Sequence, residues 1–227
     1  MAQLAEPLSI VMLGATGAVG QQVVATLLAM PDVERLTLLR RRPLEGVTNA
    51  AVRQHVVDVF APSSYAPLLP GHQIAICTLG VGQPSKVSRE ELVRVDKTAV
   101  LGFAAACKAA GIRHFQLLGS VGASAPSRSF FLRTKGELED GLKALKFDRL
   151  SLFQPSMILT PTNRYGWSQG LTLAVWPLLQ PVLVGDLRKF RGIPIATLGR
   201  AIAVNALSHK TGVETLHWDE IMALAAS

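Results

Sequence analysis

Short apolar runs alternate with longer stretches of helical periodicity along the first 155 residues of the chain. This alternation is typical of parallel βαβ units, in which each buried strand is followed by a helix that covers the sheet. The predicted strands are Leu8–Leu13, Leu36–Leu39, Gln54–Val57, Ile74–Thr78, His114–Leu118 and Leu150–Gln154. The predicted helices between them are Val19–Ala29, Ser88–Ala110 and Phe130–Leu145. We therefore expect a doubly wound parallel α/β sheet, with ligands at the carboxyl ends of its strands.

The length of 227 residues fits one large domain. Beyond Pro155 the regular pattern decays into a segment with several prolines, which is followed by helical runs at Thr197–Leu207 and Asp219–Ala225. We expect a single domain over residues 1–227, in which residues 156–227 contribute a small C-terminal cap on the substrate side of the sheet rather than a separate folding unit.

The segment Gly14-Ala15-Thr16-Gly17-Ala18-Val19-Gly20 directly follows the first predicted strand and opens the first predicted helix. In this context the first glycine makes a tight turn, the second lets the backbone approach a pyrophosphate, and the third lets the helix pack closely on the strand. Backbone N–H groups at the positive end of the helix then face the anion. The segment predicts an NAD(P)-binding Rossmann fold; a glycine-rich turn without a ligand is the alternative.

Three consecutive arginines, Arg40, Arg41 and Arg42, follow the second predicted strand, where an NAD-preferring site places an acid for the ribose 2′-hydroxyl. A guanidinium there can pair with a 2′-phosphate through two hydrogen bonds, so the sequence favours NADP(H), and NAD(H) stays open. Three neighbouring side chains cannot all enter one pocket, so Arg40 and Arg41 are the candidates. A solvated basic run is the alternative.

Two further strand ends supply candidate cofactor contacts. Asp58 closes the third predicted strand, where its carboxylate can accept a hydrogen bond from the adenine amino group or cap the next helix. Thr78, Leu79 and Gly80 end the fourth strand, and the glycine lets a dinucleotide pass close to the backbone. A plain loop is the competing interpretation of this second segment.

Several later segments occur in a characteristic order. They are Leu-Leu-Gly-Ser120 at the end of the fifth strand, Phe131-Leu-Arg-Thr-Lys135 in the next helix, Leu-Phe-Gln-Pro155-Ser in the sixth strand, and Lys189-Phe-Arg-Gly-Ile-Pro194-Ile. Together with the glycine turn, they make the chain resemble the atypical short-chain dehydrogenase/reductases. The resemblance is closest to the Tat-interacting-protein-like oxidoreductases and more distant to the NmrA-like regulators, and it covers nearly the whole chain.

The resemblance implies a catalytic serine, tyrosine and lysine, the last two being four residues apart on one helix face. In such enzymes the phenol donates a proton as hydride reaches a carbonyl, the ammonium lowers the pKa of the phenol and holds the nicotinamide ribose, and the serine orients the carbonyl. Carried over by position, the serine is Ser120 and the lysine, which also contacts the cofactor, is Lys135. The tyrosine position holds Phe131.

A phenyl ring keeps the packing of tyrosine but has no proton to donate, and general acid catalysis is commonly worth ~10²–10⁴-fold in rate. Tyr165, beyond the sixth strand on the substrate side, is the candidate substitute donor, although an aromatic pocket wall is the commoner use of such a residue. An alternative alignment takes Ser124 as the catalytic hydroxyl. Ser129 is placed to cap the helix that contains Lys135.

Composition limits the compartment and the partners. Only two cysteines, Cys77 and Cys107, are present, without the spacing of metal ligands, so we expect a reducing cytoplasm and no metal site. The apolar run from Leu171 to Val184 is interrupted by prolines and is shorter than the ~20 residues of a bilayer span, so we expect no membrane insertion. It can instead be a lid or a homodimer face.

The formal net charge of +7 indicates an anionic partner. The basic residues are dispersed apart from Arg40–Arg42 and Arg188–Arg191, and no nucleic-acid motif is present, so we do not expect a nucleic-acid partner.

Two functions fit these observations. The first is an NADP(H)-binding oxidoreductase that acts on a small carbonyl or unsaturated substrate, and its support is the intact set of cofactor signals. The second is a non-catalytic dinucleotide-binding protein whose occupancy changes a partner surface. Its main support is Phe131 at the tyrosine position.

Overall fold

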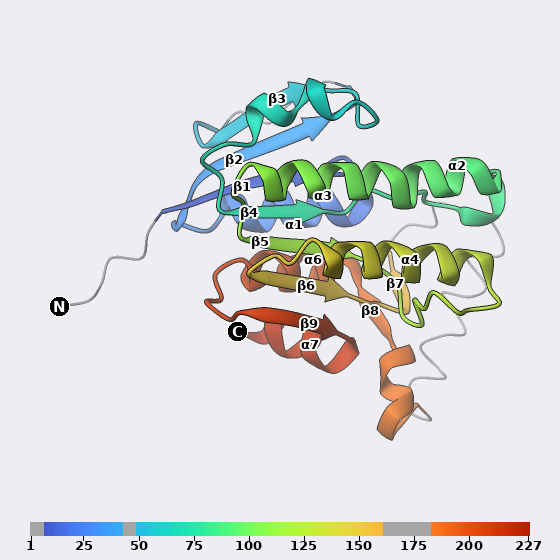
Figure 1. The fold of residues 1–227 in the computed structure, drawn as a ribbon. Helices are drawn as coiled ribbons and strands as arrows, with labels where there is room; N and C mark the ends of the chain where they lie inside the picture. Colours follow the sequence, from blue (N-terminus) through green and yellow to red (C-terminus); the bar gives the residue numbers. More distant parts are fainter. Residues whose placement is uncertain (1–6, 43–48, 161–182) are drawn as a thin grey trace.

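The computed structural model describes residues 7–42, 49–160 and 183–227. Its central element is a seven-stranded parallel sheet with the strand order β3-β2-β1-β4-β5-β6-β9 (Figure 1). The strands are β1 (Leu8–Leu13), β2 (Val33–Arg40), β3 (Val52–Val56), β4 (Ile74–Cys77), β5 (His114–Leu118), β6 (Arg149–Phe153) and β9 (Gly212–Leu216). The order reverses between β1 and β4, which is the switch point where open α/β sheets bind ligands.

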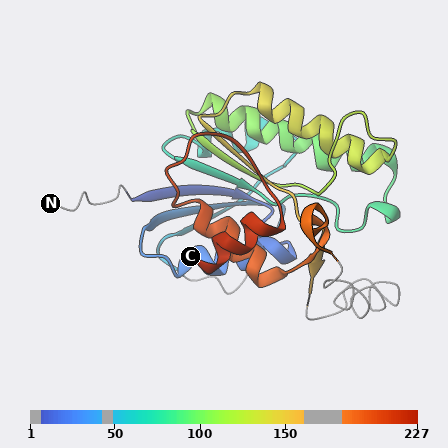
Figure 2. The ribbon, with the colours of Figure 1, turned by 90° about the horizontal axis from the view of Figure 1, so that it is seen from below.

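Helices cover both faces of this sheet, and Figure 2 shows the two layers on opposite sides of it. One layer consists of α1 (Ala18–Leu28), α6 (Ile195–Asn205) and α7 (Trp218–Ala226). The other consists of α2 (Arg89–Val93), the π-helix η4 (Arg94–Ala99), α3 (Val100–Ala109) and α4 (Phe130–Ala144). The predicted doubly wound α/β fold is therefore confirmed.

The central strands are mainly apolar because both of their faces are covered. In β1, Ile10 and Met12 point into the core beneath α1, whereas Val11 and Leu13 point into the core beneath α3, and none of the four is more than 1% exposed. Successive strand residues alternate between faces, so a strand that is buried on both sides reads as a continuous apolar run.

All six predicted strands are present, with small differences at their ends. Strand β2 is longer than predicted, so Arg40 is its last residue rather than part of the following loop. The predicted helix Ser88–Ala110 contains the π-helical stretch Arg94–Ala99, a local feature that proteins often place at functional sites. The Ser129 hydroxyl caps α4 by accepting from the Leu132 N–H, as predicted.

The C-terminal part differs most from the sequence prediction. Strand β9 was not predicted, because four of its five residues are exposed or half-buried and only Leu216 is buried. Strands β7 (Met157–Leu159) and β8 (Gly192–Pro194) form a separate two-stranded sheet, close in sequence to the 3₁₀-helix η6 (Gly185–Phe190). Within the predicted cap, residues 156–227, the elements α6, β9 and α7 belong to the main sheet and its helical layer, whereas β7 and β8 form a sheet of their own. The other 3₁₀-helices are η1 (Pro62–Ser64), η2 (Ala66–Leu68) and η3 (Pro84–Lys86).

Candidate functional site

The turn between β1 and α1 requires glycine at both of its ends for steric reasons. Gly14 has φ +96°, and a Cβ there would lie 2.5 Å from the Leu79 nitrogen. A Cβ on Gly20 would lie 2.2 Å from the Gly14 oxygen, so this glycine allows the helix to pack on the turn. At Gly17 the nearest atom would be the Gly14 oxygen at 3.3 Å. The middle glycine therefore leaves room on the outer side of the turn, where a ligand would approach.

The start of α1 offers free backbone donors. Gly17 is the N-cap residue, and no side chain caps the first turn. The first N–H groups of a helix have no partner inside the helix and carry the positive end of its dipole. Ala18, Val19 and Gly20 line a cavity of about 490 Å³ at this point. This combination suits the binding of a diphosphate.

The end of β4 forms the next wall of the cavity. The Thr78 hydroxyl donates to the Gly14 carbonyl oxygen at 3.0 Å, which ties the two strand ends together. Thr78, Leu79 and Gly80 all line the same cavity. The structure thus brings this predicted segment next to the glycine turn.

Asp96 also lines the cavity, next to the loop after β4, and it was not among the predicted site residues. Its carboxylate is 2.8 Å from the Lys135 ammonium and also accepts a hydrogen bond of 2.7 Å from the Val81 N–H. The two side chains are buried, with exposed fractions of 1% for Asp96 and 8% for Lys135. An acid on the apolar face of a predicted helix, one position after Val95 and three before Ala99, was the only available signal.

Phe131 lies one helical turn before Lys135, as the spacing predicted. The Lys135 nitrogen is 5.8 Å from the centre of the Phe131 ring, within the range of a cation–π interaction. Both residues line the cavity. The ammonium is therefore held between a carboxylate and an aromatic face, and the position that the resemblance assigns to a phenol carries a hydrocarbon ring.

The two candidate serines have different surroundings. Ser120 lines the cavity, and its hydroxyl makes a long contact of 3.5 Å with the Val121 oxygen. The backbone of Ser124 packs against α4, where a Cβ on Gly136 would lie 2.1 Å from the Ser124 carbonyl carbon. Ser124 is absent from the described lining of the cavity. The geometry therefore favours Ser120 over Ser124 as a hydroxyl facing a ligand.

Apolar side chains make up much of the remaining lining of the cavity. They are Phe131, Pro155, Met157, Ile158 and Ile195, and the polar Ser156 and Thr160 lie among them in the sequence. Tyr165, the candidate substitute proton donor, lies outside the described residues.

Several predicted cofactor residues do not line the cavity. Gly14, Ala15 and Thr16 belong to the turn behind it, and Arg41 is exposed. Arg40 is only 4% exposed, and its Nε and Nη1 atoms have no hydrogen-bond partner within the described residues. The exposed Asp58 carboxylate accepts from the Phe60 N–H at 2.9 Å, so it closes a turn. Asp58 does not cap the following 3₁₀-helix η1, whose N-cap residue is Ala61, and its contact with adenine stays a prediction.

A buried carboxyl group, that of Glu139, lies behind Gly119, which lines the cavity. Glu139, one helical turn after Lys135, is 3% exposed and accepts two hydrogen bonds from the Gln154 amide at 2.8 and 2.9 Å. Burial raises the pKa of Glu139. A Cβ on Gly119 would lie 3.0 Å from a Glu139 oxygen, so the residue before Ser120 must be small.

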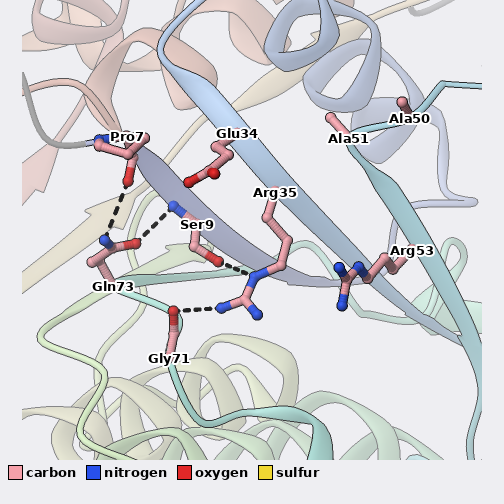
Figure 3. Close-up of a pocket in the computed structure, with 9 residues that line it drawn as sticks. All are labelled: Pro7, Ser9, Glu34, Arg35, Ala50, Ala51, Arg53, Gly71 and Gln73. Carbon is pink, nitrogen blue, oxygen red and sulfur yellow. Dashed lines mark hydrogen bonds between the residues drawn. The ribbon is translucent and has the colours of Figure 1, made fainter.

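A second cavity, of about 440 Å³, lies near the amino ends of β1 and β2 (Figure 3). Arg35 crosses it and donates to the Ser9 hydroxyl and the Gly71 carbonyl oxygen. Arg53 lies at its rim. Among the predicted site residues that the structure describes, none lines this cavity, and it lies at the opposite end of the strands from the glycine turn. The cavity at the carboxyl ends is therefore the candidate site.

Comparison with known proteins agrees with this geometry. Residues 14–149 match the NAD(P)H-binding family. Protein HTATIP2 of Rattus norvegicus is 34% identical over 208 residues, which cover 90% of this chain and 83% of that relative. The chain belongs to the NAD(P)H-binding family. The similarity to HTATIP2 also confirms the predicted resemblance to the Tat-interacting-protein-like proteins.

Other similarities are broader. The FMP52 protein of Lodderomyces elongisporus, which is named mitochondrial, is 30% identical and covers 79% of this chain and 83% of its own length. The oxidoreductase ylbE from Lactococcus lactis superposes with a TM-score of 0.70 at 18% identity, over 97% of this chain and 98% of its own. MoeE5 in complex with UDP-glucuronic acid and NAD has a TM-score of 0.70 at 16% identity, over 96% and 81%. At these identities the structural matches show the fold alone.

These comparisons leave the cellular location a prediction. We expected the cytoplasm from the cysteine content, whereas the fungal relative is named mitochondrial. Among the residues that the structure describes, no helix is long and apolar enough to span a bilayer.

Proposed function

We propose that this member of the NAD(P)H-binding family is an NADP(H)-dependent oxidoreductase acting on a small carbonyl or unsaturated substrate. The observation that supports the proposal is the single cavity that joins the uncapped start of α1 to the Lys135–Asp96 pair. A diphosphate would lie on the N–H groups after Gly17. The remaining part of the dinucleotide would extend along Thr78–Gly80 toward Lys135.

The residues at the far end of the cavity suit hydride transfer. When bound, the reduced nicotinamide supplies two electrons and a hydrogen as hydride. The Lys135 ammonium would hold the nicotinamide ribose and present a positive charge to an oxygen that gains negative charge. The Ser120 hydroxyl would orient that oxygen, and the apolar wall around Met157 would hold the body of the substrate.

Arg40 supports a preference for NADP(H) over NAD(H). Its guanidinium is buried at the end of β2, the strand whose end faces the adenosine ribose in this fold. Buried donors are normally satisfied, so Nε and Nη1 atoms without a partner in the described residues suit a bound anion. A ribose 2′-phosphate has the charge and geometry for this pairing.

Calorimetric titration with NADP⁺ and NAD⁺ tests the proposal. We expect the wild type to bind NADP⁺ more tightly. Loss of a hydrogen bond to a charged group costs about 1.5–3 kcal/mol, so Arg40→Gln should weaken NADP⁺ binding by roughly 10- to 100-fold and NAD⁺ binding far less. Arg53→Gln, an exposed arginine at the opposite end of the sheet, is the matched control. Equal losses for both nucleotides, or a wild-type preference for NAD⁺, would contradict the role of Arg40.

A non-catalytic dinucleotide-binding regulator is the second candidate, and Phe131 is the observation that favours it. In that case NADP(H) would bind without turnover of any acceptor. Its occupancy would change a surface that a homodimer or another protein contacts. Tight nucleotide binding without reduction of quinones, aldehydes or enones would favour this candidate.

A further inference from the structure

The cavity contains a positive charge but lacks, in its described lining, the acid that ketone reduction needs. Hydride addition to a simple ketone makes an alkoxide, a strong base that must receive a proton as it forms. The described lining side chains that carry an exchangeable proton are the Lys135 ammonium and four hydroxyls, which belong to Thr78, Ser120, Ser156 and Thr160. Phe131 contributes none.

The proton of Lys135 is held by its counterion. If the ammonium donated its proton, the Asp96 carboxylate would remain 1% exposed without its countercharge, and its other hydrogen bond comes from a neutral Val81 N–H. An uncompensated buried charge is strongly unfavourable. Lys135 is therefore suited to stabilise an oxyanion by its charge while keeping its proton.

An acceptor that matches this site must form a weakly basic anion when it receives hydride. A quinone does so, because its hydride adduct is a hydroquinone monoanion whose charge is shared with a newly aromatic ring. The balanced step is NADPH + quinone + H⁺ → NADP⁺ + hydroquinone. The C4–H bond of the nicotinamide breaks, an O–H bond forms at one quinone oxygen, and the electron pair moves through the ring to the other oxygen, which takes up the proton from the solvent afterwards.

The walls of the cavity favour the same class of molecule. The Phe131 ring, Met157, Ile158 and Ile195 surround the substrate end with apolar atoms, and aromatic rings prefer stacked or edge-on aromatic neighbours. A planar quinone would present its faces to this wall and one oxygen to Lys135.

We propose that the substrate class of this site is the quinones rather than simple ketones, an inference that rests on the proposed NADP(H)-dependent function. The phenyl ring of Phe131, at the position where the resemblance implies a phenol, would then favour quinones over simple ketones. The full chain should reduce 1,4-naphthoquinone at least about 100-fold faster than 1-tetralone, a ketone of the same bicyclic size, because the missing acid is worth ~10²–10⁴-fold.

The test follows NADPH oxidation with each acceptor, corrected for the reaction without protein, and quantifies the hydroquinone. Phe131→Tyr restores a phenol beside Lys135 and should reduce the quinone-to-tetralone rate ratio at least tenfold. Tyr165→Phe covers the tyrosine outside the described residues and should leave that ratio within twofold of wild type.

Each result is decisive. Comparable wild-type rates with the two acceptors would overturn the quinone assignment and leave the oxidoreductase function standing. Tetralone reduction that Tyr165→Phe abolishes would also overturn the assignment, because the acid would then be Tyr165. A ratio that Phe131→Tyr leaves unchanged would overturn it too. NADPH binding without reduction of either acceptor would overturn both the assignment and the oxidoreductase function.

Discussion

Asp96 joins two parts of the candidate site that are separate in sequence. One carboxylate contacts the ammonium of α4 and the backbone of the loop after β4. That loop and Lys135 both line the candidate cavity. The Asp96 carboxylate therefore fixes the position of Lys135 relative to the loop after β4.

Asp96→Asn should destabilise the protein by about 3 kcal/mol, because removing one partner leaves the buried Lys135 charge uncompensated. Urea unfolding measures the change in the free energy of unfolding. The double variant Asp96→Asn/Lys135→Met removes both charges and should recover most of the loss. If the double variant is as unstable as the sum of both single variants, the two side chains are not coupled.

Besides its backbone pairing with β6 and the buried Leu216 side chain, strand β9 is attached to the sheet by a polar network. Glu214 on β9 accepts hydrogen bonds from Arg149 and from the Ser151 hydroxyl, both on β6. His114 on β5 lies against the same hydroxyl at 2.9 Å, and the Asn205 side chain of α6 donates to it. The edge strand is thus fixed by groups whose hydrogen bonds depend on the protonation of their neighbours.

His114 should make the protein less stable in acid. Burial and the nearby Arg149 charge lower its pKa from about 6.5 to about 3. Between these values the unfolded chain binds the proton and the folded chain does not, so the stability is fully present above about pH 6.5 and is lost as the pH falls toward 3.

His114→Gln should reduce the slope of stability against pH in this window by up to about 1.4 kcal/mol per pH unit. Urea titrations at several pH values measure the slope. His209→Gln, which changes an exposed histidine, is the control and should keep the wild-type slope. An unaltered slope in His114→Gln would show that other groups cause the acid sensitivity.

The candidate cofactor site spans the middle of the molecule. Its lining comes from the β1–α1 turn, the β4 loop, α4 and the segment after β6, so both halves of the sheet contribute. The second cavity is lined by residues near the starts of β1, β2 and β3 and by the segment that leads into β4. A ligand in the candidate site therefore contacts elements that separate when the protein unfolds.

NADP⁺ should raise the melting temperature of the whole domain. A ligand at 100 times its Kd stabilises the folded state by about 2.7 kcal/mol, which corresponds to roughly 5–10 °C for a domain of this size. Differential scanning calorimetry measures the shift, and NAD⁺ at the same concentration should produce a smaller one. A melting temperature independent of NADP⁺ would exclude binding to the folded state.

The sequence by itself determined the features that depend on local chemistry. Apolar runs identified strands such as β1 and β4, because most residues that are buried between two helical layers are apolar. The spacing of Gly14, Gly17 and Gly20 identified the turn, and the four-residue spacing of Phe131 and Lys135 placed both on one face of a helix.

Tertiary structure decided the features that depend on contacts between distant segments. Asp96 reads as one acid in a helix until the crossover places it against Lys135, and Arg40 reads as part of a basic run until β2 extends to bury it. Strand β9 has little apolar pattern, since Leu216 is its one buried residue, and Glu214 on this strand forms an ion pair with Arg149 of β6. A local sequence window holds only one partner of each such pair, so these contacts exist only in the folded chain.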